Sequence, residues 1–314
     1  MINWGIVGLG RMGMAFANAI EETDNALLKG VASKSGKRFK NFENFSYEDL
    51  IQREDIDAIY IATLNNTHID LIKHISKEGK KILCEKPVSL SLEDLIETEA
   101  LVNKKSINFY EAIAYYSHPQ TTEILNLYGK NDFGKIKSIE CNFGFKAKFK
   151  TSSRLFNKSL GGGSIFDLGC YPISFFMLFV ENYEKISITS KSLNYAKNGV
   201  DDEAELILNY DNKFEGKLKV SLKSDLDNIC KINFENGYIK INQPWLPEKK
   251  TNIEVSIKDH YFIKTIHSDL SVYANQIQNV SECFINQNKE INLFDINKSI
   301  INMKIITDWL KKND

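Results

Sequence analysis

Residues 2–13 read INWGIVGLGRMG, an apolar run followed at once by the pattern Gly-x-Gly-x-x-Gly. Residues 2–7 have the composition of a buried strand, and the glycines after them would open a helix. In that context Gly8 permits a tight turn, Gly10 lets the backbone approach a pyrophosphate, and Gly13 allows close helix–strand packing. The stretch predicts a dinucleotide-binding fold at the start of the chain, with a purely structural glycine turn as the alternative.

Up to about residue 118 the chain repeats this strand–helix rhythm. Strand-like runs lie at 2–7, 27–32, 58–62, 81–84 and 107–110, and helical patterns at 12–21, 67–78 and 92–103. Near-continuous apolar strands separated by helices imply a parallel sheet that is covered on both faces. We therefore expect an α/β fold in which residues 1–118 form a Rossmann domain, a doubly wound parallel sheet that binds a dinucleotide.

Beyond residue 119 the pattern changes to longer strands that often alternate polar and apolar residues. Strand-like runs lie at 136–149, 204–210, 214–223, 231–241 and 253–266, and helical patterns at 272–284 and 295–310. Alternation is typical of a sheet with one face in water, and Asn236-Gly237 is a strong hairpin signal. We expect residues 119–314 to form an α+β domain with a large, mostly antiparallel open sheet.

Composition excludes several classes of protein. The 314 residues include 40 Lys and Arg against 41 Asp and Glu, which argues against a nucleic-acid binder that relies on a basic field. The longest apolar stretch, residues 173–180, is far shorter than the roughly 20 residues of a membrane span. No basic leader precedes the first strand, so we expect a cytoplasmic protein. Neither the five cysteines nor the five histidines show metal-ligand spacing, so we expect reduced thiols and no metal.

The choice of cofactor is indicated just after the second strand-like run, where residues 32–38 read ASKSGKR. An NAD enzyme usually places Asp or Glu there to hold the ribose 2′-hydroxyl. Here a hydroxyl and cations from Ser33, Lys34 and Arg38 suit a 2′-phosphate, and no carboxylate repels it. The loop predicts NADP(H) rather than NAD(H), with a solvated basic loop as the alternative.

Three further segments point to a family. Residues 84–87 read CEKP, Glu111-Ala112 is followed by HPQ at 118–120, and residues 161–172 read GGGSIFDLGCYP. Together with the N-terminal glycines, these segments resemble the glucose–fructose oxidoreductase / inositol dehydrogenase (Gfo/Idh/MocA) family from end to end. Tyr171 resembles the dihydrodiol dehydrogenase, aldose dehydrogenase and sugar ketoreductase branches, since inositol dehydrogenase-like members usually carry His there. One departure is that many relatives have Arg where this chain has Tyr116 or Ser117.

The resemblance implies which residues meet the cofactor and the substrate. The expected cofactor contacts are Gly8, Gly10, Arg11, Met12, Gly13, Ser33, Lys34, Arg38, Thr63, Asn65, His68, Glu85, Lys86 and Pro87. A cis bond often precedes the proline of this motif. The substrate pocket is expected to be lined by Lys86, Asp167 and Tyr171, with Arg154 as a lesser candidate.

The same residue types make chemical sense without the family. Oxidising an alcohol by hydride transfer requires removal of the hydroxyl proton, and reducing a ketone requires its delivery. A tyrosine titrates near 10, so Tyr171 needs a neighbouring cation, which Lys86 could provide. Asp167 precedes Tyr171 by four positions and shares its face if the segment is helical. Taken singly, each of these residues, like Arg154, could equally be structural.

The combined expectation is an NADP(H)-dependent oxidoreductase that transfers a hydride to or from a hydroxyl-bearing carbon of a sugar-like or cyclic-diol substrate. One alternative is a reductase of a keto-sugar, possibly nucleotide-linked, in sugar biosynthesis. The other is a non-catalytic cofactor-binding regulator, which would keep the glycines but need not keep Lys86 with Tyr171. We also expect a homodimer or homotetramer formed through the C-terminal sheet.

Overall fold

The computed structural model describes residues 1–130, 132–286 and 291–311. The chain divides into two compact units, the first made of Met1–His118 and Asp269–Ile300, the second of Pro119–Ser268 and the residues from Ile301 onward. The sequence-based division assigned all of residues 119–314 to the second domain. The structure differs there, because Asp269–Ile300 clusters with the first unit.

The first unit is built on a parallel sheet of six strands in the order β3-β2-β1-β4-β5-β6. The strands are β1 (Ile2–Val7), β2 (Ala26–Ala32), β3 (Asn44–Phe45), β4 (Ala58–Ile61), β5 (Lys81–Cys84) and β6 (Phe109–Glu111). Strand order reverses between β1 and β4, and open α/β sheets bind ligands at the carboxyl ends of strands beside such a point. The expected Rossmann sheet is confirmed.

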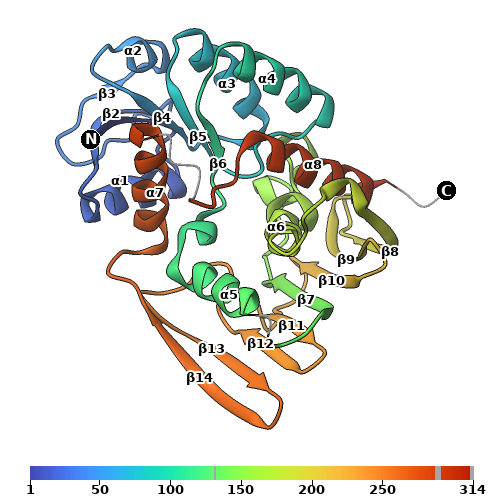
Figure 1. The fold of residues 1–314 in the computed structure, drawn as a ribbon. Helices are drawn as coiled ribbons and strands as arrows, with labels where there is room; N and C mark the ends of the chain where they lie inside the picture. The colour runs from blue at the N-terminus through green and yellow to red at the C-terminus, as the bar shows by residue number, and fades with distance from the viewer. Residues whose placement is uncertain (131, 287–290, 312–314) are drawn as a thin grey trace. The chain divides into compact units, whose positions relative to one another are not determined.

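Helices connect these strands, as expected from the sequence (Figure 1). The connecting helices are α1 (Arg11–Ala19), α2 (Tyr47–Gln52), α3 (His68–Lys77) and α4 (Leu92–Lys104), with the 3₁₀ turns η1 (Ile20–Glu22) and η2 (Asn65–Thr67). The unit also contains the 3₁₀ turn η3 (Ala114–Ser117), which follows β6, and α7 (Val272–Asn286), which follows the second sheet in sequence. The Ser91 hydroxyl caps α4 by accepting a hydrogen bond from the Asp94 amide at 3.1 Å. The sequence analysis did not find β3 or α2, because two and six residues are too short to show a period.

Helix α7 joins the first unit because its apolar face completes that unit's core. The indole of Trp4 on β1 donates a hydrogen bond to the Ser281 hydroxyl at 3.0 Å, and both groups are buried. The Phe284 ring lies 5.7 Å from the Trp4 ring and 5.7 Å from the Tyr110 ring. These contacts give the C-terminal segment its place beside the first sheet, although it follows the second sheet in sequence.

The second unit contains a sheet of eight strands in the order β14-β13-β12-β11-β7-β10-β9-β8. The strands are β7 (Ile136–Gly144), β8 (Ile186–Tyr195), β9 (Asp201–Tyr210), β10 (Phe214–Ser221), β11 (Cys230–Phe234), β12 (Gly237–Ile241), β13 (Lys250–Ile257) and β14 (His260–His267). Only the β7–β10 pair is parallel, which confirms the expected mostly antiparallel sheet. The runs at 231–241 and 253–266 are each two strands joined by a turn, as Asn236-Gly237 indicated for the first.

Short helices complete this unit. They are α5 (Pro119–Gly129), α6 (Cys170–Met177), the 3₁₀ turns η4 (Arg154–Phe156), η5 (Lys158–Leu160) and η7 (Tyr183–Lys185), and a π-helical turn, η6 (Ile165–Gly169). A further helix, α8 (Ile296–Leu310), ends in this unit, where the Trp309 indole donates a hydrogen bond to the Glu205 carbonyl at 3.0 Å.

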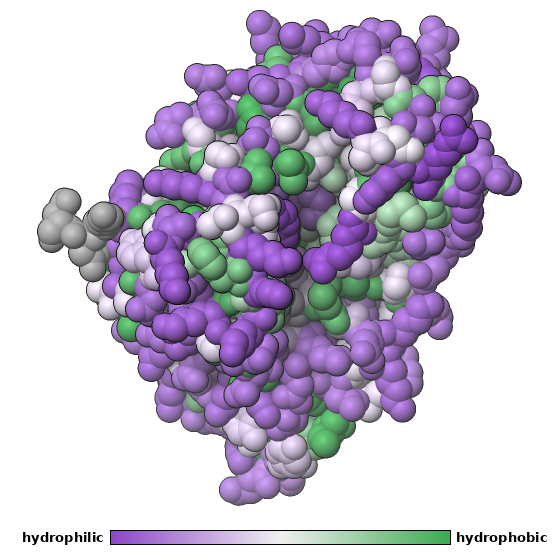
Figure 2. Space-filling view, turned by 180° about the vertical axis from the view of Figure 1, so that it is seen from behind, coloured by the Kyte–Doolittle hydropathy of each residue, from purple (hydrophilic) through white to green (hydrophobic). Residues whose placement is uncertain are grey.

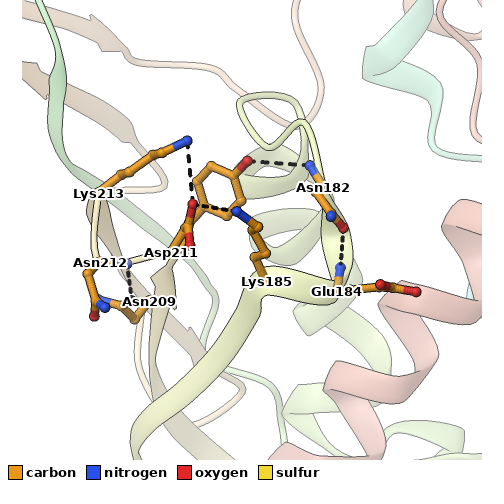
Figure 3. Close-up of polar contacts among 8 residues, drawn as sticks. Asn182, Glu184, Lys185, Asn209, Asp211, Asn212 and Lys213 are labelled. Atoms are coloured by element: carbon orange, nitrogen blue, oxygen red, sulfur yellow. Dashed lines mark hydrogen bonds and ion pairs between the residues drawn. The ribbon is translucent and has the colours of Figure 1, made fainter.

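The turn between β9 and β10 shows how polar residues shape the rim of this sheet (Figure 3). Asp211 and Asn212, the central residues of a turn in which the Lys213 amide donates to the Tyr210 carbonyl at 2.7 Å, both have positive φ, 52° and 54°. The Asp211 carboxylate accepts from the Lys185 ammonium at 2.9 Å, and the Tyr210 hydroxyl accepts from the Asn182 amide at 3.4 Å. The exposed ion pair contributes little energy, so the turn conformation itself fixes the hairpin.

One face of the eight-stranded sheet is buried, and the other carries charged pairs. Lys219 and Glu205 are 2.9 Å apart on neighbouring strands, and Lys240 and Glu254 are 3.0 Å apart. Three consecutive large apolar side chains are exposed on the outermost strand, β14, at Tyr261, Phe262 and Ile263. On the surface seen in Figure 2, hydrophobic residues likewise occur in small groups among hydrophilic ones.

No helix within the described residues is long and apolar enough to cross a membrane.

Candidate active site

The turn after β1 has the geometry that the glycine pattern predicts. Gly8 has φ of +101°, a conformation that side chains disfavour. A Cβ on Gly13 would lie 2.0 Å from the Gly8 carbonyl oxygen, so only glycine lets α1 begin this close to the strand. Gly10 is the N-cap of α1 and supplies no side-chain hydrogen bond. The first amides of α1 therefore form the kind of helix N-terminus that binds phosphate.

The loop after β2 carries the residues expected to recognise a 2′-phosphate. Ser33 is buried and its hydroxyl lies 3.0 Å from that of Ser35. Lys34 and Arg38 are exposed, and the Lys34 ammonium lies 5.2 Å from the centroid of the Tyr47 ring. Among the described residues, no carboxylate lies within 4.0 Å of either cation. With Lys37, the loop carries three exposed positive charges, and none of its residues is acidic.

The segment after β4 brings together Thr63, Asn65 and His68. The Thr63 hydroxyl lies 2.7 Å from that of Thr67. Asn65 is buried, and its side-chain amide nitrogen has no hydrogen-bond partner among the described residues. Leaving a buried donor without a hydrogen-bond partner costs free energy. An unpaired donor at this position is therefore expected if a ligand supplies the acceptor.

These features fit a dinucleotide. A Cβ added at Gly10 would meet nothing nearer than the Ala62 carbonyl oxygen at 3.9 Å, so the space above the turn is open. The unpaired amide of Asn65 lies in the loop that follows the next strand of the sheet, β4. The glycine turn lies at the start of α1, where the phosphates of such a group would be held.

Lys86 follows β5 and is half-buried, and three buried side chains contact its neighbours in the loop, two of them at the backbone. The Tyr60 hydroxyl donates a hydrogen bond to the Glu85 carboxylate. His68 lies 3.0 Å from the Pro87 carbonyl through Nδ1, and Glu111 accepts from the Val88 amide at 3.1 Å. The bond between Lys86 and Pro87 is cis.

Burial controls the ionisation of these three side chains. It lowers the pKa of His68 to about 4, so the ring is neutral and carries one N–H. We assign that proton to Nδ1, because the contact with Pro87 is shorter than the 3.4 Å between Nε2 and the Thr63 carbonyl. Burial, and then the Glu85 charge, raises the pKa of Tyr60 well above its usual range. Burial also raises the pKa of Glu111 to about 7.

Several of these supporting residues escaped the sequence analysis. Tyr60 was counted only as part of a strand, and Glu111 only as a marker of the domain crossover. Tyr273 on α7 is close enough for Glu85, Arg11 and Lys86 to influence its pKa, which burial raises. No local pattern could reveal Tyr273, because it follows Lys86 by nearly two hundred residues.

In the second unit, Asp167 and Arg154 form an ion pair. Arg154 Nη2 donates to Asp167 Oδ1 at 2.9 Å, and the Asp167 side chain is only 7% exposed. Asp167 lies in the π-helical turn η6, a feature that is frequent at functional sites. Asp201 anchors the start of that turn by accepting from the Ser164 hydroxyl and the Ile165 amide, both at 2.8 Å.

Tyr171 lies in α6, one helical turn after Asp167, and aromatic rings surround it. Its ring meets Phe143 edge-on with centroids 5.2 Å apart, and lies 5.9 Å from the ring of Trp245. The Trp245 indole donates to the Asn142 carbonyl at 3.1 Å, which fixes that ring. Tyr171 is half-buried, so packing holds its ring while part of it stays accessible. The sequence analysis missed Trp245.

Tyr116, at one of the two positions where many relatives have Arg, is buried and packs edge-on against Phe294.

The five cysteines are all unbridged and buried, and Cys141 and Cys230 have sulfurs 2.9 Å apart on paired strands. Within the described residues, no group of three or more His, Cys, Asp and Glu side chains is placed to hold a metal ion.

Comparison with known proteins extends this picture. Residues 2–112 match the family model of the oxidoreductase family with an NAD-binding Rossmann fold, and residues 122–240 match the GFO/IDH/MocA C-terminal domain. A trans-1,2-dihydrobenzene-1,2-diol dehydrogenase of Xenopus tropicalis is 30% identical over 82% of this chain and 80% of its own. A D-xylose 1-dehydrogenase (NADP(+)) of Haloferax volcanii is 26% identical over 72% of this chain and 68% of its own.

Among solved structures, the 3-ketoreductase of Actinomadura kijaniata in complex with NADP and TDP-benzene is similar, with a TM-score of 0.85. The match covers 98% of this chain and 96% of the ketoreductase chain at 19% identity, and it shows a shared fold. A Rossmann sheet with a phosphate-binding glycine turn, followed by an open-sheet domain, defines a class of NAD(P)-binding oxidoreductases. This chain belongs to one such family, the Gfo/Idh/MocA oxidoreductases, as its motifs suggested.

Proposed function

We propose that this chain is an NADP(H)-dependent oxidoreductase that transfers a hydride to or from a hydroxyl-bearing carbon of a sugar-like or cyclic-diol substrate. The observation that carries the proposal is the loop at Lys86, where separate buried side chains contact the Glu85 carboxylate, the Pro87 carbonyl and the Val88 amide. Such support is what a reactive lysine at the carboxyl edge of the sheet requires.

NADP(H) is proposed because Lys34 and Arg38 stand where an NAD enzyme would place a carboxylate. The Haloferax volcanii relative is named as an NADP(+) enzyme, which supports the same choice. When bound, the nicotinamide supplies or accepts the hydride. The Ser33–Arg38 loop then selects the cofactor through charge-assisted hydrogen bonds.

Lys86 and Tyr171 are proposed to hold and move the proton of the substrate hydroxyl, at Nζ and at the phenolic oxygen, respectively. Asp167, fixed by Arg154, is proposed to accept a hydrogen bond from a substrate hydroxyl and so orient it. The rings around Tyr171 suit a substrate with an apolar ring face, which sugars and cyclic diols both have.

We also propose that copies of the chain associate, as a homodimer or homotetramer. Support comes from β14, the outermost strand of the second sheet, which exposes Tyr261, Phe262 and Ile263. An edge strand with exposed large apolar side chains is normally covered.

The deciding experiment is steady-state turnover with aldoses, inositols, dihydrodiols and nucleotide-linked keto-sugars, each with NADP(H) and NAD(H). We expect turnover of a neutral polyol or diol with NADP⁺. Efficient reduction of keto-sugars alone would favour the biosynthetic alternative. Tight cofactor binding with no turnover of any substrate would favour a regulator and contradict the proposal.

A further inference from the structure

Glu111, the last residue of β6, has a carboxyl group that no part of the proposed proton transfer uses. Only 4% of the residue is exposed. Its Oε1 accepts from the Val88 amide at 3.1 Å, and the Ser299 hydroxyl on α8, which donates to the Asp295 carbonyl at 3.1 Å, is close enough to lower the pKa of the carboxyl. Its own amide donates to the Phe294 carbonyl at 2.8 Å. The side chain is therefore fixed against the loop that carries Lys86.

The charges around Glu111 come from one strand end and its loop. Glu85 and Lys86 act on its carboxyl, and Glu111 in turn raises the pKa of the buried Cys84 thiol. Burial is the largest influence on the Glu111 carboxyl, and it raises the pKa to about 7. The Ser299 hydroxyl, the hydrogen bond from Val88 and the charge of Lys86 lower this pKa, whereas Glu85 raises it.

The position of this carboxyl leads to an inference about Lys86. We infer that Glu111 is a positioning residue for Lys86: it holds the Lys86 loop through the Val88 amide, and its charge sets the protonation of the Lys86 amine. A carboxylate next to an amine favours the ammonium form, and a neutral carboxyl removes that support. Because the two groups interact, they titrate as a pair.

Other titratable and charged groups near Lys86 are Arg11, Tyr273 and Glu85. Arg11 and Lys86 both act on Tyr273, but arginine stays charged and burial raises the pKa of the Tyr273 hydroxyl. The Glu85 carboxylate accepts a hydrogen bond from the Tyr60 hydroxyl. A substitution at position 111 leaves all three of these groups in place and changes only the Glu111 carboxyl. The importance of this coupling for catalysis rests on the proposed function, whereas the coupling itself does not.

The first test measures Lys86 in the full chain without substrate. Lysines are trace-labelled with acetic anhydride between pH 6 and 11, and the Lys86 peptide is quantified by mass spectrometry. Glu111→Gln, which keeps an acceptor oxygen for Val88, should lower the midpoint of Lys86 labelling by about 0.5 to 1 pH unit. Glu111→Asp should return the midpoint most of the way to the wild-type value, and Glu78→Gln, at an exposed residue, should leave the midpoint unchanged. Labelling curves for Glu111→Gln and wild type that superimpose would overturn the inference, as would a Glu111→Asp curve that matches Glu111→Gln.

A second test uses the reciprocal effect and remains informative if Glu111→Gln folds poorly. The infrared carbonyl band of a protonated buried carboxyl reports Glu111 directly. Lys86→Met should raise the midpoint at which this band disappears, because the neighbouring cation is lost. An unchanged midpoint would contradict the coupling.

If the proposed oxidoreductase activity holds, Glu111→Gln should shift the pH profile of kcat and leave KM within about twofold. A rise in KM with an unshifted kcat profile would overturn the positioning role. Absence of turnover with every substrate would instead count against the proposed function, and the labelling and infrared results would still decide the inference.

Discussion

Arg154 donates a hydrogen bond to Asp167 across 2.9 Å, from a half-exposed side chain to one that is 7% exposed. The pair joins the 3₁₀ turn η4 to the π-helical turn η6, one turn before Tyr171. A buried carboxylate of this kind keeps its orientation only while its cation is present.

Arg154→Met should therefore impair both substrate binding and stability. We expect KM to rise roughly tenfold, which corresponds to about 1.4 kcal/mol of lost binding. The midpoint of thermal unfolding should fall by about 2 to 4 °C, since breaking a half-exposed pair costs about 1 kcal/mol. Steady-state kinetics and calorimetry measure both effects, with the exposed Lys158→Met as control. Unchanged KM and stability would remove Arg154 from the site.

Tyr171→Phe should reduce kcat by about 10²- to 10⁴-fold, because it removes only the hydroxyl that is proposed to transfer the proton. The ring keeps its contacts with Phe143 and Trp245, so circular dichroism and cofactor affinity should not change. Lys86→Ala should lose at least as much activity. Tyr195→Phe, on an exposed residue of β8, serves as control. If Tyr171→Phe keeps more than about a third of the activity, proton transfer belongs to another group.

The double variant Lys34→Ala/Arg38→Ala should weaken NADPH binding roughly 10- to 100-fold and leave NADH binding nearly unchanged, because charge-assisted hydrogen bonds contribute about 1.5 to 3 kcal/mol. Fluorescence titration of both cofactors measures the difference. The exposed pair Lys104→Ala/Lys105→Ala, in the same unit, controls for the loss of two charges. Tighter binding of NADH by the wild type would refute the assignment.

Glu111 should make the free energy of unfolding depend on pH. Its pKa is raised from 4.5 to about 7 in the folded state, so between these values the unfolded chain loses the proton that the folded chain keeps. The stability that the folded chain gains by keeping this proton is fully present below about pH 4.5 and is lost as pH rises through 7. The free energy of unfolding of Glu111→Gln, relative to that of the wild type, should therefore rise by on the order of 1–3 kcal/mol between pH 5 and pH 8. Urea unfolding at the two pH values tests this, and an equal difference at both would contradict it.

Light scattering should give a mass of at least twice the 35.9 kDa of one chain at micromolar concentration. Ile263→Lys should shift the protein towards the monomer, because it places a charge among the exposed apolar residues of β14. Lys258→Glu, at the neighbouring turn, controls for a change of charge alone. A wild type that is monomeric would exclude association through this strand.

Much of the first unit could be predicted because its signals are local. The glycine spacing after an apolar run reports the β1 turn directly, since the turn itself requires the positive φ of Gly8, and Gly13 lies against the Gly8 carbonyl only five residues earlier. The short strand β3 and helix α2 were missed, because they hold too few residues to show a period. The continuous run at 253–266 concealed a hairpin, because Lys258-Asp259 is not one of the common turn pairs.

The sequence by itself determined the Rossmann sheet, the open sheet, the family, and the identities of Lys86, Asp167 and Tyr171 as candidates. The tertiary structure decided what supports those candidates. Glu111 and His68 reach the Lys86 loop from 25 and 18 positions away, α7 returns to the first sheet after the second is complete, and Trp245 meets Tyr171 from a distant loop. Periodicity and motifs record contacts between near neighbours, whereas burial, pKa and side-chain support depend on residues that only folding brings together.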